Sequence, residues 1–383
     1  MSKYTIIATA AMGLEALVAQ EVRNLGYECQ VDNGKVIFKG DELAIARANL
    51  WLRTADRIKI QVAQFKAYTF EELFQGVKKI AWGDFLPKDA EFPVIGKSVK
   101  SKLASVPDCQ SIVKKAVVEK LKEHYRISTS WLEETGDLYR IEVALLKDVA
   151  TITLDASGAG LHKRGYRTDQ GEAPLKETLA AALIMLTNWT ADKPFVDPFC
   201  GSGTIPIEAA LIGQNIAPGF NRDFVSEKWN WIGSDVWDKA REEVEDRANY
   251  DQPLDISGHD IDHRMINIAK ENAFEAGLGE IISFKQMQVV DFTTNKQFGV
   301  IVGNPPYGER LGEKKQVEEM YKQMGQAFQP YEDTWSIYML TSHEGFEELY
   351  GRQATKKRKL FNGFIRTDLY QYWAKQKPKR LNK

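Results

Sequence analysis

The chain has 383 residues, with 51 Lys and Arg, 53 Asp and Glu, and a formal net charge of −2 at pH 7. This length predicts two or three domains, and an apolar content of 43% is enough to fill their cores. The near-zero charge excludes a general electrostatic attraction to nucleic acid. Cys29, Cys109 and Cys200 are too few and too far apart for a disulfide framework or a metal-ligand pattern, so we expect no bound metal.

No signal peptide or membrane span is indicated, because the first twenty residues, MSKYTIIATAAMGLEALVAQ, are interrupted by charge and glycine. We therefore expect a cytoplasmic protein with no membrane contact. The oligomeric state is open, with a homodimer as one option.

Residues 1–65 predict a small ferredoxin-like α+β unit. Its apolar residues between 14 and 25 recur with the period of a helix, whereas Ile58, Ile60 and Val62 alternate as in a strand. The predicted elements, in chain order, are a strand at 4–8, a helix at 14–25, a strand at 36–38, a helix at 43–52 and a strand at 58–62.

Residues 66–156 predict a second α+β unit, in which an amphipathic helix is followed by two alternating strands. Gly158 and Gly160 then mark a linker at 157–170, which leaves 171–383 as the last part of the chain. The second unit is predicted to contain a helix at 70–80, a strand near 92–95, a helix around 112–121 and strands at 138–145 and 149–154.

A glycine-rich loop, CGSG at 200–203, separates a predicted strand at 194–196 from a predicted apolar helix at 204–212. Glycine lets the backbone turn tightly and approach a ligand, so this loop is a candidate cofactor site. Pro206 stands where the dinucleotide fingerprint has its third glycine, and no Gly-Lys-Ser/Thr follows, so pyrophosphate binding is disfavoured. Cys200 could be a nucleophile, but inside this loop it would face the cofactor, and we interpret it as a small residue that fits.

Acidic residues follow the next two predicted strands. Asp260, within GHDID at 258–262, is placed to accept the ribose hydroxyls of an adenosyl group. Asp262 is the alternative, although Asp is also a preferred helix N-cap. A strand at 281–284 leads to Asp291, a candidate acceptor for an adenine amino group.

Asn304-Pro305-Pro306-Tyr307 follows a short apolar run at 300–302 that predicts a buried parallel strand. The Asn304 oxygen and a backbone carbonyl can accept both hydrogens of an exocyclic amine, and the prolines stiffen the loop. Tyr307 offers a flat face for an unstacked base. The same residues could form an ordinary turn, but the upstream glycine loop favours methyl transfer from S-adenosylmethionine to a nitrogen on a planar base.

About forty residues between Ile212 and Asp255 exceed the usual length of a loop and should have structure or function of their own. We interpret Trp229, Trp231 and Trp237 as a packing cluster rather than a base-stacking platform. The segment KAREEVEDRA after them predicts an exposed, charged helix.

Five motifs occur in the order LHKRGYR (161–167), APLKETLAAALI (173–184), DPFCGSGTIPIEAA (197–210), GHDID (258–262) and NPPYGERLG (304–312). Their combination resembles the THUMP-domain class I RNA methyltransferases, in particular the large-subunit rRNA guanine-N2 methyltransferases. The resemblance implies an α/β fold, with a Rossmann-like methyltransferase domain preceded by an α+β ferredoxin-like and THUMP region that binds RNA. It implies S-adenosylmethionine as cofactor, held by Gly201, Gly203, Asp260 and Asp291, and amine binding by Asn304 and Pro305.

The candidate catalytic residues are therefore Asn304, Pro305, Pro306 and Tyr307. The predicted cofactor site comprises Asp197, Phe199, Gly201, Gly203, Thr204, Asp260, Asp262, Asp291 and Asn304.

Basic residues gather in three runs, near 97–102, 162–167 and 356–359, which makes an RNA-facing surface plausible despite the neutral chain. The predicted RNA contacts are Lys97, Lys100, Lys102, Lys163, Arg164 and Arg167.

The function that the sequence favours is methylation of guanine N2 in RNA, with 23S rRNA as the substrate. A tRNA guanine-N2 methyltransferase would share both the THUMP region and the Asn-Pro-Pro-Tyr loop. A DNA adenine-N6 methyltransferase would share that loop but would not be expected to carry an RNA-binding N-terminal half. A non-catalytic RNA-binding or assembly factor would need neither the intact Asn304 nor the intact glycine loop.

Overall fold

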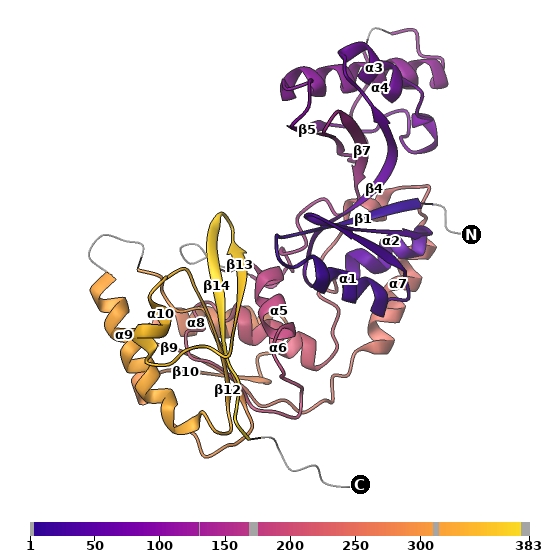
Figure 1. Cartoon of the computed structure of the whole chain (residues 1–383). Coiled ribbons are helices and arrows are strands. Elements are labelled where there is room, and N and C mark those ends of the chain that lie inside the picture. The colour runs from indigo at the N-terminus through magenta and orange to yellow at the C-terminus, as the bar shows by residue number, and fades with distance from the viewer. Residues whose placement is uncertain (1–3, 130, 168–174, 309–313, 377–383) are drawn as a thin grey trace. The chain divides into compact units, whose positions relative to one another are not determined.

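The computed structural model describes residues 4–129, 131–167, 175–308 and 314–376. The chain divides into two compact units, and each contains a segment from the other half of the sequence (Figure 1). The first unit comprises the chain up to residue 10, residues 18–161 and residues 223–243, and the second comprises residues 11–17, residues 162–222 and the chain from residue 244 onward.

In the first unit, the described strands form a seven-stranded sheet in the order β2-β3-β1-β4-β7-β6-β5. The long strand β4 (Ala55–Lys66) pairs antiparallel with β1 over its first half and with β7 over its second half, so both α+β parts share it. The other strands are β1 (Tyr4–Ala10), β2 (Cys29–Asp32), β3 (Lys35–Gly40), β5 (Val94–Val99), β6 (Ile141–Leu146) and β7 (Val149–Asp155), and the helices are α1 (Glu15–Asn24), α2 (Glu42–Trp51), α3 (Phe70–Lys78), α4 (Val106–Tyr125) and α7 (Ser234–Arg247).

The tryptophans of the 213–255 segment pack inside the first unit, as the sequence predicted. Trp229 is fully buried and stacks on Tyr139, with ring centroids 4.8 Å apart. Its indole N–H donates to the Leu138 carbonyl at 3.0 Å. Trp237 is also buried and stacks on Phe224 at 5.4 Å. Because these rings are covered by protein, they form a core and not a platform for bases.

The second unit contains a mostly parallel sheet in the order β10-β9-β8-β11-β12-β14-β13. Strand β14 is antiparallel to both of its neighbours, while the other pairings are parallel. The strands are β8 (Phe195–Asp197), β9 (Ile256–Asp260), β10 (Ile282–Gln286), β11 (Val300–Gly303), β12 (Ser336–Thr341), β13 (Lys356–Asn362) and β14 (Ile365–Tyr372), and the helices are α5 (Glu177–Met185), α6 (Thr204–Gly213), α8 (His263–Glu275), α9 (Lys314–Phe328) and α10 (Phe346–Tyr350).

Two hydrophobic clusters cover the two faces of this second sheet. Val300 and Val302 point into the cluster that contains α5, α6 and α8, whereas Ile301 points into the cluster that contains α9 and α10. Side chains alternate along a strand, so a strand that is buried on both faces must be apolar throughout. This arrangement confirms the Rossmann-like α/β fold predicted for the C-terminal half. Among the described residues, no helix is both long and apolar enough to cross a bilayer.

If Trp229 stabilises the first unit by packing, Trp229→Ala should lower the free energy of unfolding by about 3–5 kcal/mol, the usual cost of emptying a buried aromatic site. Trp131→Ala is the matched control, because Trp131 is 67% exposed and should cost less than about 0.5 kcal/mol. Urea unfolding followed by circular dichroism measures both. Equal stability of the two variants would contradict the packing role.

Candidate active site

The two loops singled out by the sequence lie side by side because their strands are neighbours. Strands β8 and β11 pair in parallel, with Val300 opposite Phe195 and Ile301 opposite Val196. The glycine loop leaves the carboxyl end of β8, and the Asn304–Tyr307 loop leaves the carboxyl end of β11. Since β9 continues the sheet on the other side of β8, this is the topological switch point at which open α/β sheets bind ligands.

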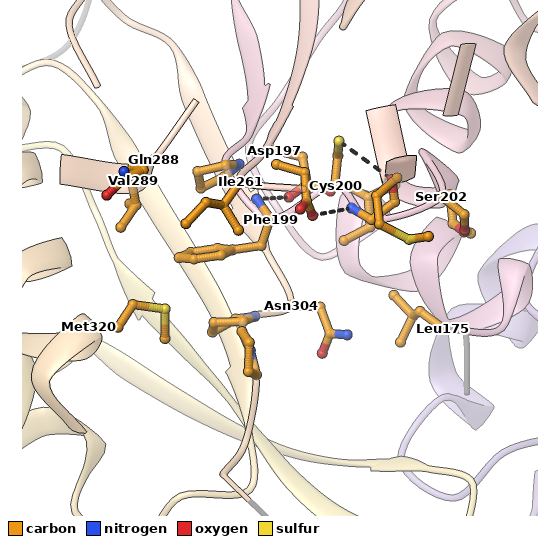
Figure 2. Close-up of a pocket in the computed structure, with 18 of the residues that line it drawn as sticks. Leu175, Asp197, Phe199, Cys200, Ser202, Ile261, Gln288, Val289, Asn304 and Met320 are labelled. Carbon is orange, nitrogen blue, oxygen red and sulfur yellow. Dashed lines mark hydrogen bonds between the residues drawn. The ribbon is translucent and has the colours of Figure 1, made fainter. Parts of the chain in front are cut away.

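A cavity of about 640 Å³ opens at this edge of the sheet, within the range of roughly 300–1,000 Å³ typical of small-molecule sites. Figure 2 shows Asn304 and Met320 across this cavity from Asp197 and Cys200. The predicted site residues that line it are Asp197, Phe199, Gly201, Thr204, Asp260, Asn304, Pro305, Pro306 and Tyr307.

Two carboxylates from neighbouring strands face the cavity. Asp260 accepts hydrogen bonds from the backbone N–H groups of Gly201 at 3.0 Å and Asp262 at 2.9 Å. Asp197 accepts from the Phe199 N–H at 3.0 Å, while its buried Oδ2 has no hydrogen-bond partner among the described residues. Burial raises the pKa of both groups, that of Asp197 well above its usual range, and their mutual proximity adds to the rise at Asp197. A ligand that donates hydrogen bonds would satisfy these oxygens.

The two glycines of the loop serve different purposes. Gly201 has φ +50°, and a Cβ added there would meet nothing within 4 Å. Gly203 has φ +84°, and a Cβ there would lie 3.0 Å from the Ala269 Cβ and 3.1 Å from Phe284. Gly201 therefore keeps space open beside the cavity, whereas Gly203 allows the backbone to turn and α6 to pack closely. The open space at Gly201 and the unpaired Asp197 oxygen fit a cofactor bound against this loop.

The Asn304–Tyr307 loop is held by hydrogen bonds of its own. The Tyr307 hydroxyl donates to Asn304 Oδ1 at 2.6 Å, and the buried Tyr321 hydroxyl donates to the Pro306 carbonyl at 2.6 Å. An amide oxygen has two lone pairs, so Asn304 can hold Tyr307 and still accept one further hydrogen. Tyr307 thus has an interaction through its hydroxyl that the sequence did not predict, in addition to its ring.

Three of the predicted cofactor residues do not line the cavity. Gly203 ends the loop as the N-cap residue of α6, and the side from which a Cβ would project packs against Ala269 and Phe284. Asp262 caps α8 by accepting from the Arg264 N–H at 2.8 Å and pairs with the Arg264 guanidinium, which holds the pKa of Asp262 below its usual range. Asp291 is exposed on the short helical turn Val289–Asp291, and its neighbours Gln288 and Val289 line the cavity in its place.

Residues 173–174 and 309–312, which belong to two of the motifs, lie outside the described residues. Several residues that line the cavity were not predicted from the sequence. A hairpin signal was available for Asn362 and Ile365, because Asn-Gly between alternating apolar residues is typical of a two-residue turn. The missed residues that line the cavity include Met265, Met287, Gln288, Met320, Gln323, Asn362 and Ile365.

Arg164 and Arg167 were predicted to contact RNA, which requires exposed side chains. The structure contradicts this prediction, because both side chains are almost completely covered. Arg164 is buried and pairs with the buried Glu208 of α6, with Nε 3.2 Å from Oε1. Arg167 pairs with Glu177 at 2.9 Å and donates to the Thr204 hydroxyl at 3.0 Å. Both guanidinium groups hold α5, α6 and the glycine loop together.

The predicted lysines, in contrast, are exposed. Lys97 pairs with Glu142 at 3.1 Å and Lys102 lies over the Tyr68 ring at 4.9 Å, both in the first unit. Lys100, also in the first unit, and Lys163, in the second, are exposed as well. These four side chains remain available as candidates for RNA contacts.

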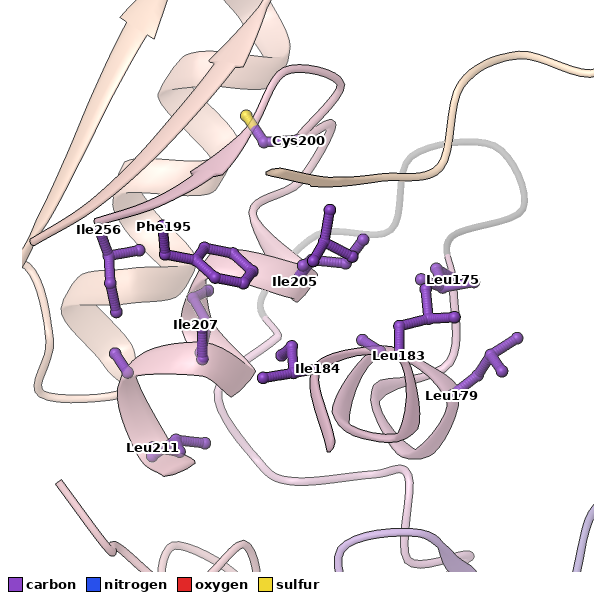
Figure 3. Close-up of a cluster of buried hydrophobic side chains, with 14 of the residues drawn as sticks. Leu175, Leu179, Leu183, Ile184, Phe195, Cys200, Ile205, Ile207, Leu211 and Ile256 are labelled. Carbon is purple, nitrogen blue, oxygen red and sulfur yellow. The ribbon is translucent and has the colours of Figure 1, made fainter. Parts of the chain in front are cut away.

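The glycine loop rests on a dense apolar cluster. Figure 3 shows Leu179 and Leu183 of α5 with Ile205 and Ile207 of α6 and Phe195 of β8 in this cluster. Cys200 lies at its upper edge, and burial raises the pKa of its thiol well above the usual range. A neutral, buried thiol agrees with the interpretation of Cys200 as a small residue and not a nucleophile.

Family models match nearly the whole chain. A model of the RMKL-like methyltransferase domain matches residues 164–371, the RlmL ferredoxin-like domain matches residues 5–59, and the THUMP domain matches residues 67–155. A Bacillus subtilis (strain 168) protein, YpsC, is 75% identical over 99% of this chain and 98% of its own length, and is named provisionally as an RNA methyltransferase.

Two solved structures share the fold along almost the full length. A Listeria monocytogenes protein, described as a predicted N6-adenine-specific DNA methylase, is 62% identical, with a TM-score of 0.93 over 97% of this chain and 96% of that one. SMU.472, described provisionally as a methyltransferase and solved with SAH, is 52% identical, with a TM-score of 0.94 over 99% of this chain and 100% of that one. SAH is the demethylated product of S-adenosylmethionine, which is therefore the cofactor of this methyltransferase fold.

The contrast between the two glycines gives a matched test. Gly201→Ala places a methyl group in the open space beside the cavity and should weaken S-adenosylmethionine binding by about tenfold or more, or about 1.4 kcal/mol, without disturbing the core. Gly203→Ala carries the same backbone strain, but should mainly lower the melting temperature because its Cβ would crowd Ala269. Calorimetric titration and thermal unfolding separate the two effects. Wild-type affinity in Gly201→Ala would contradict the location of the cofactor.

The raised pKa of Asp197 predicts a pH-dependent cost in stability. The folded state disfavours the ionised carboxylate, so stability is lost as pH rises from the ordinary value of 3.8 toward the raised folded value. Asp197→Asn should therefore raise the melting temperature at pH 7, and the gain should disappear below pH 3.8. Asp262→Asn keeps a half-exposed N-cap and should change the melting temperature little at either pH. A loss of stability in Asp197→Asn at pH 7 would contradict the conclusion that the ionised Asp197 carboxylate destabilises the folded state.

Proposed function

Because the chain belongs to the RMKL-like family of THUMP-containing class I RNA methyltransferases, we propose that it methylates the N2 amino group of guanine in RNA, with 23S rRNA as the carrier. The observation that carries this proposal is the meeting of the Asn304–Tyr307 loop and the glycine loop at one cavity, across the paired strands β8 and β11.

The residues of the cavity divide into two groups. Asp197, Gly201 and Asp260 would hold the cofactor, whose sulfonium supplies an electrophilic methyl group. Asn304 Oδ1 and the Pro305 carbonyl would accept the two hydrogens of the target amine, as the resemblance of the motifs implies, while the Pro306 carbonyl anchors the loop by accepting from Tyr321. These contacts orient the nitrogen lone pair and strengthen as the nitrogen becomes tetrahedral, so they favour the transition state over the bound substrate.

RNA is preferred over DNA as the substrate because the first unit carries the THUMP domain and the exposed Lys97, Lys100 and Lys102. Lys163 adds an exposed cation in the second unit. Phosphate contacts of this kind give affinity without sequence information. The choice of guanine N2 over other exocyclic amines rests on the resemblance of the motifs, since Asn304 and a carbonyl can accept hydrogens from any of them.

A deletion strain complemented with variants tests the proposal directly. We expect mass spectrometry of nucleosides to show loss of N2-methylguanosine from 23S rRNA in the deletion strain and its recovery with the wild-type gene. Asn304→Ala should not restore it, because loss of one transition-state contact costs roughly 10²- to 10³-fold in kcat, while calorimetry should show unchanged cofactor affinity. Asn267→Ala, an exposed change on α8, should restore it fully.

Each other outcome points to a different function. Loss of N2-methylguanosine from tRNA alone would identify a tRNA enzyme, and loss of N6-methyladenine from DNA would overturn the RNA assignment. Restoration by Asn304→Ala would remove the Asn304–Tyr307 loop from the reaction.

A further inference from the structure

The C-terminal hairpin places the aromatic side chain of Phe364 in a turn beside the cavity. Strands β13 and β14 end in a two-residue turn, Gly363-Phe364, closed by the pair Asn362 and Ile365. Gly363 has φ +62°, which suits the first central position of a type II′ turn. Figure 1 shows the yellow hairpin extending beyond the neighbouring strands of its sheet. Asn362 and Ile365 both line the cavity, so the turn between them stands at its edge.

Phe364 is fully exposed, at 105% of its reference area. The two residues that close the turn, Asn362 and Ile365, in contrast line the cavity. The Phe364 ring contributes nothing to the core of the unit, so the fold itself does not explain a large apolar residue at this position. Asn362 points toward the active site, because its Nδ2 donates to the Tyr307 hydroxyl at 3.4 Å. The turn is thereby connected to the loop that is proposed to hold the target amine.

Basic side chains flank the same turn. Arg366 is 62% exposed and lies 3.9 Å from Asp368, and Lys359 is exposed on the opposite strand of the hairpin. An exposed aromatic ring on a hairpin that also carries exposed cations is a combination with which proteins bind single-stranded nucleic acid, the ring stacking on a base and the cations pairing with phosphates. The charge of the hairpin thus suits the RNA substrate of the family.

We propose that Phe364 stacks on the nucleotide next to the methylated one and so stabilises RNA whose target base has left its stack. A base that enters the cavity leaves its neighbour without a stacking partner, and an aromatic side chain at the edge of the cavity can replace that partner. Asn362 connects this turn to the Asn304–Tyr307 loop through its hydrogen bond to the Tyr307 hydroxyl. The inference rests on the proposed entry of the base beside Asn304.

The test measures methyl transfer from radiolabelled S-adenosylmethionine to total RNA of the deletion strain, which contains both unmodified rRNA and tRNA. Phe364→Ala should lower kcat/KM for RNA by about 5- to 150-fold, the range that corresponds to stacking of one base on an aromatic side chain. Phe364→Trp should stay within about threefold of the wild type, because the stacking surface remains. Cofactor affinity and melting temperature should not change in either variant, since the side chain is exposed.

Phe274→Ala is the matched control, because Phe274 is 75% exposed on α8 of the same unit and does not line the cavity. Wild-type kcat/KM in Phe364→Ala, an equal loss in Phe274→Ala, or weakened cofactor binding in Phe364→Ala would each overturn the stacking role. Asn304→Ala in the same assay separates the two proposals. If it is inactive while Phe364→Ala is unimpaired, the hairpin inference fails and the site stands; if it is fully active, the proposed function of the site fails.

Discussion

The parallel pairing of β8 with β11 is the constraint on which the site depends. The two loops are about a hundred residues apart in sequence, and only the register of Val300 with Phe195 and Ile301 with Val196 brings them to one edge. The backbone of Cys200 adds to this constraint, because its N–H donates to the His259 carbonyl of β9 at 2.8 Å. A one-residue slip in a strand exchanges its two faces, so the apolar residues that alternate between the two hydrophobic clusters also fix the position of Asn304.

Buried ion pairs provide the second level of support. Arg164 with Glu208, and Arg167 with Glu177, place opposite charges inside the second unit, where desolvation is expensive and the mutual attraction only partly offsets it. Such pairs are a weak source of stability, but their geometry is specific. Arg167 also donates to the Thr204 and Ser202 hydroxyls, so a single planar group orients residues from α5, α6 and the glycine loop.

Most of the secondary structure could be predicted from periodicity, and the failures have physical reasons. Strand β4 was predicted at 58–62 and extends over Ala55–Lys66, because its outer residues are half exposed and lack clean alternation. Strand β2 was missed, since three of its four residues are exposed. Strand β12 was missed too, although it is buried along its whole length and has the kind of short apolar run from which β11 was predicted. The hairpin signal in Asn362-Gly363 was overlooked, and the turn uses Gly363-Phe364 as its central residues.

The site shows where residue type alone is not enough. The spacing of motifs correctly indicated that Asp260, Gly201 and Asn304 would meet at one cavity. It failed for Arg164 and Arg167, because a basic run looks the same in sequence whether its side chains face solvent or a buried carboxylate. The partners Glu177 and Glu208 stand on α5 and α6, and only the fold brings them to the basic run.

The electrostatics of the cavity follow from the same topology. Adjacent parallel strands end at the same edge, so Asp197 at the end of β8 lies near Asp260 at the end of β9, and the charge of Asp260 adds to the cost of ionising Asp197. The presence of both Asp197 and Asp260 at this edge, one with a buried oxygen left unpaired, indicates that the missing hydrogen-bond donors belong to the ligand. Cofactor binding would then relieve an unfavourable arrangement that the apoprotein maintains, and the stability of the second unit should be coupled to occupancy of its cavity.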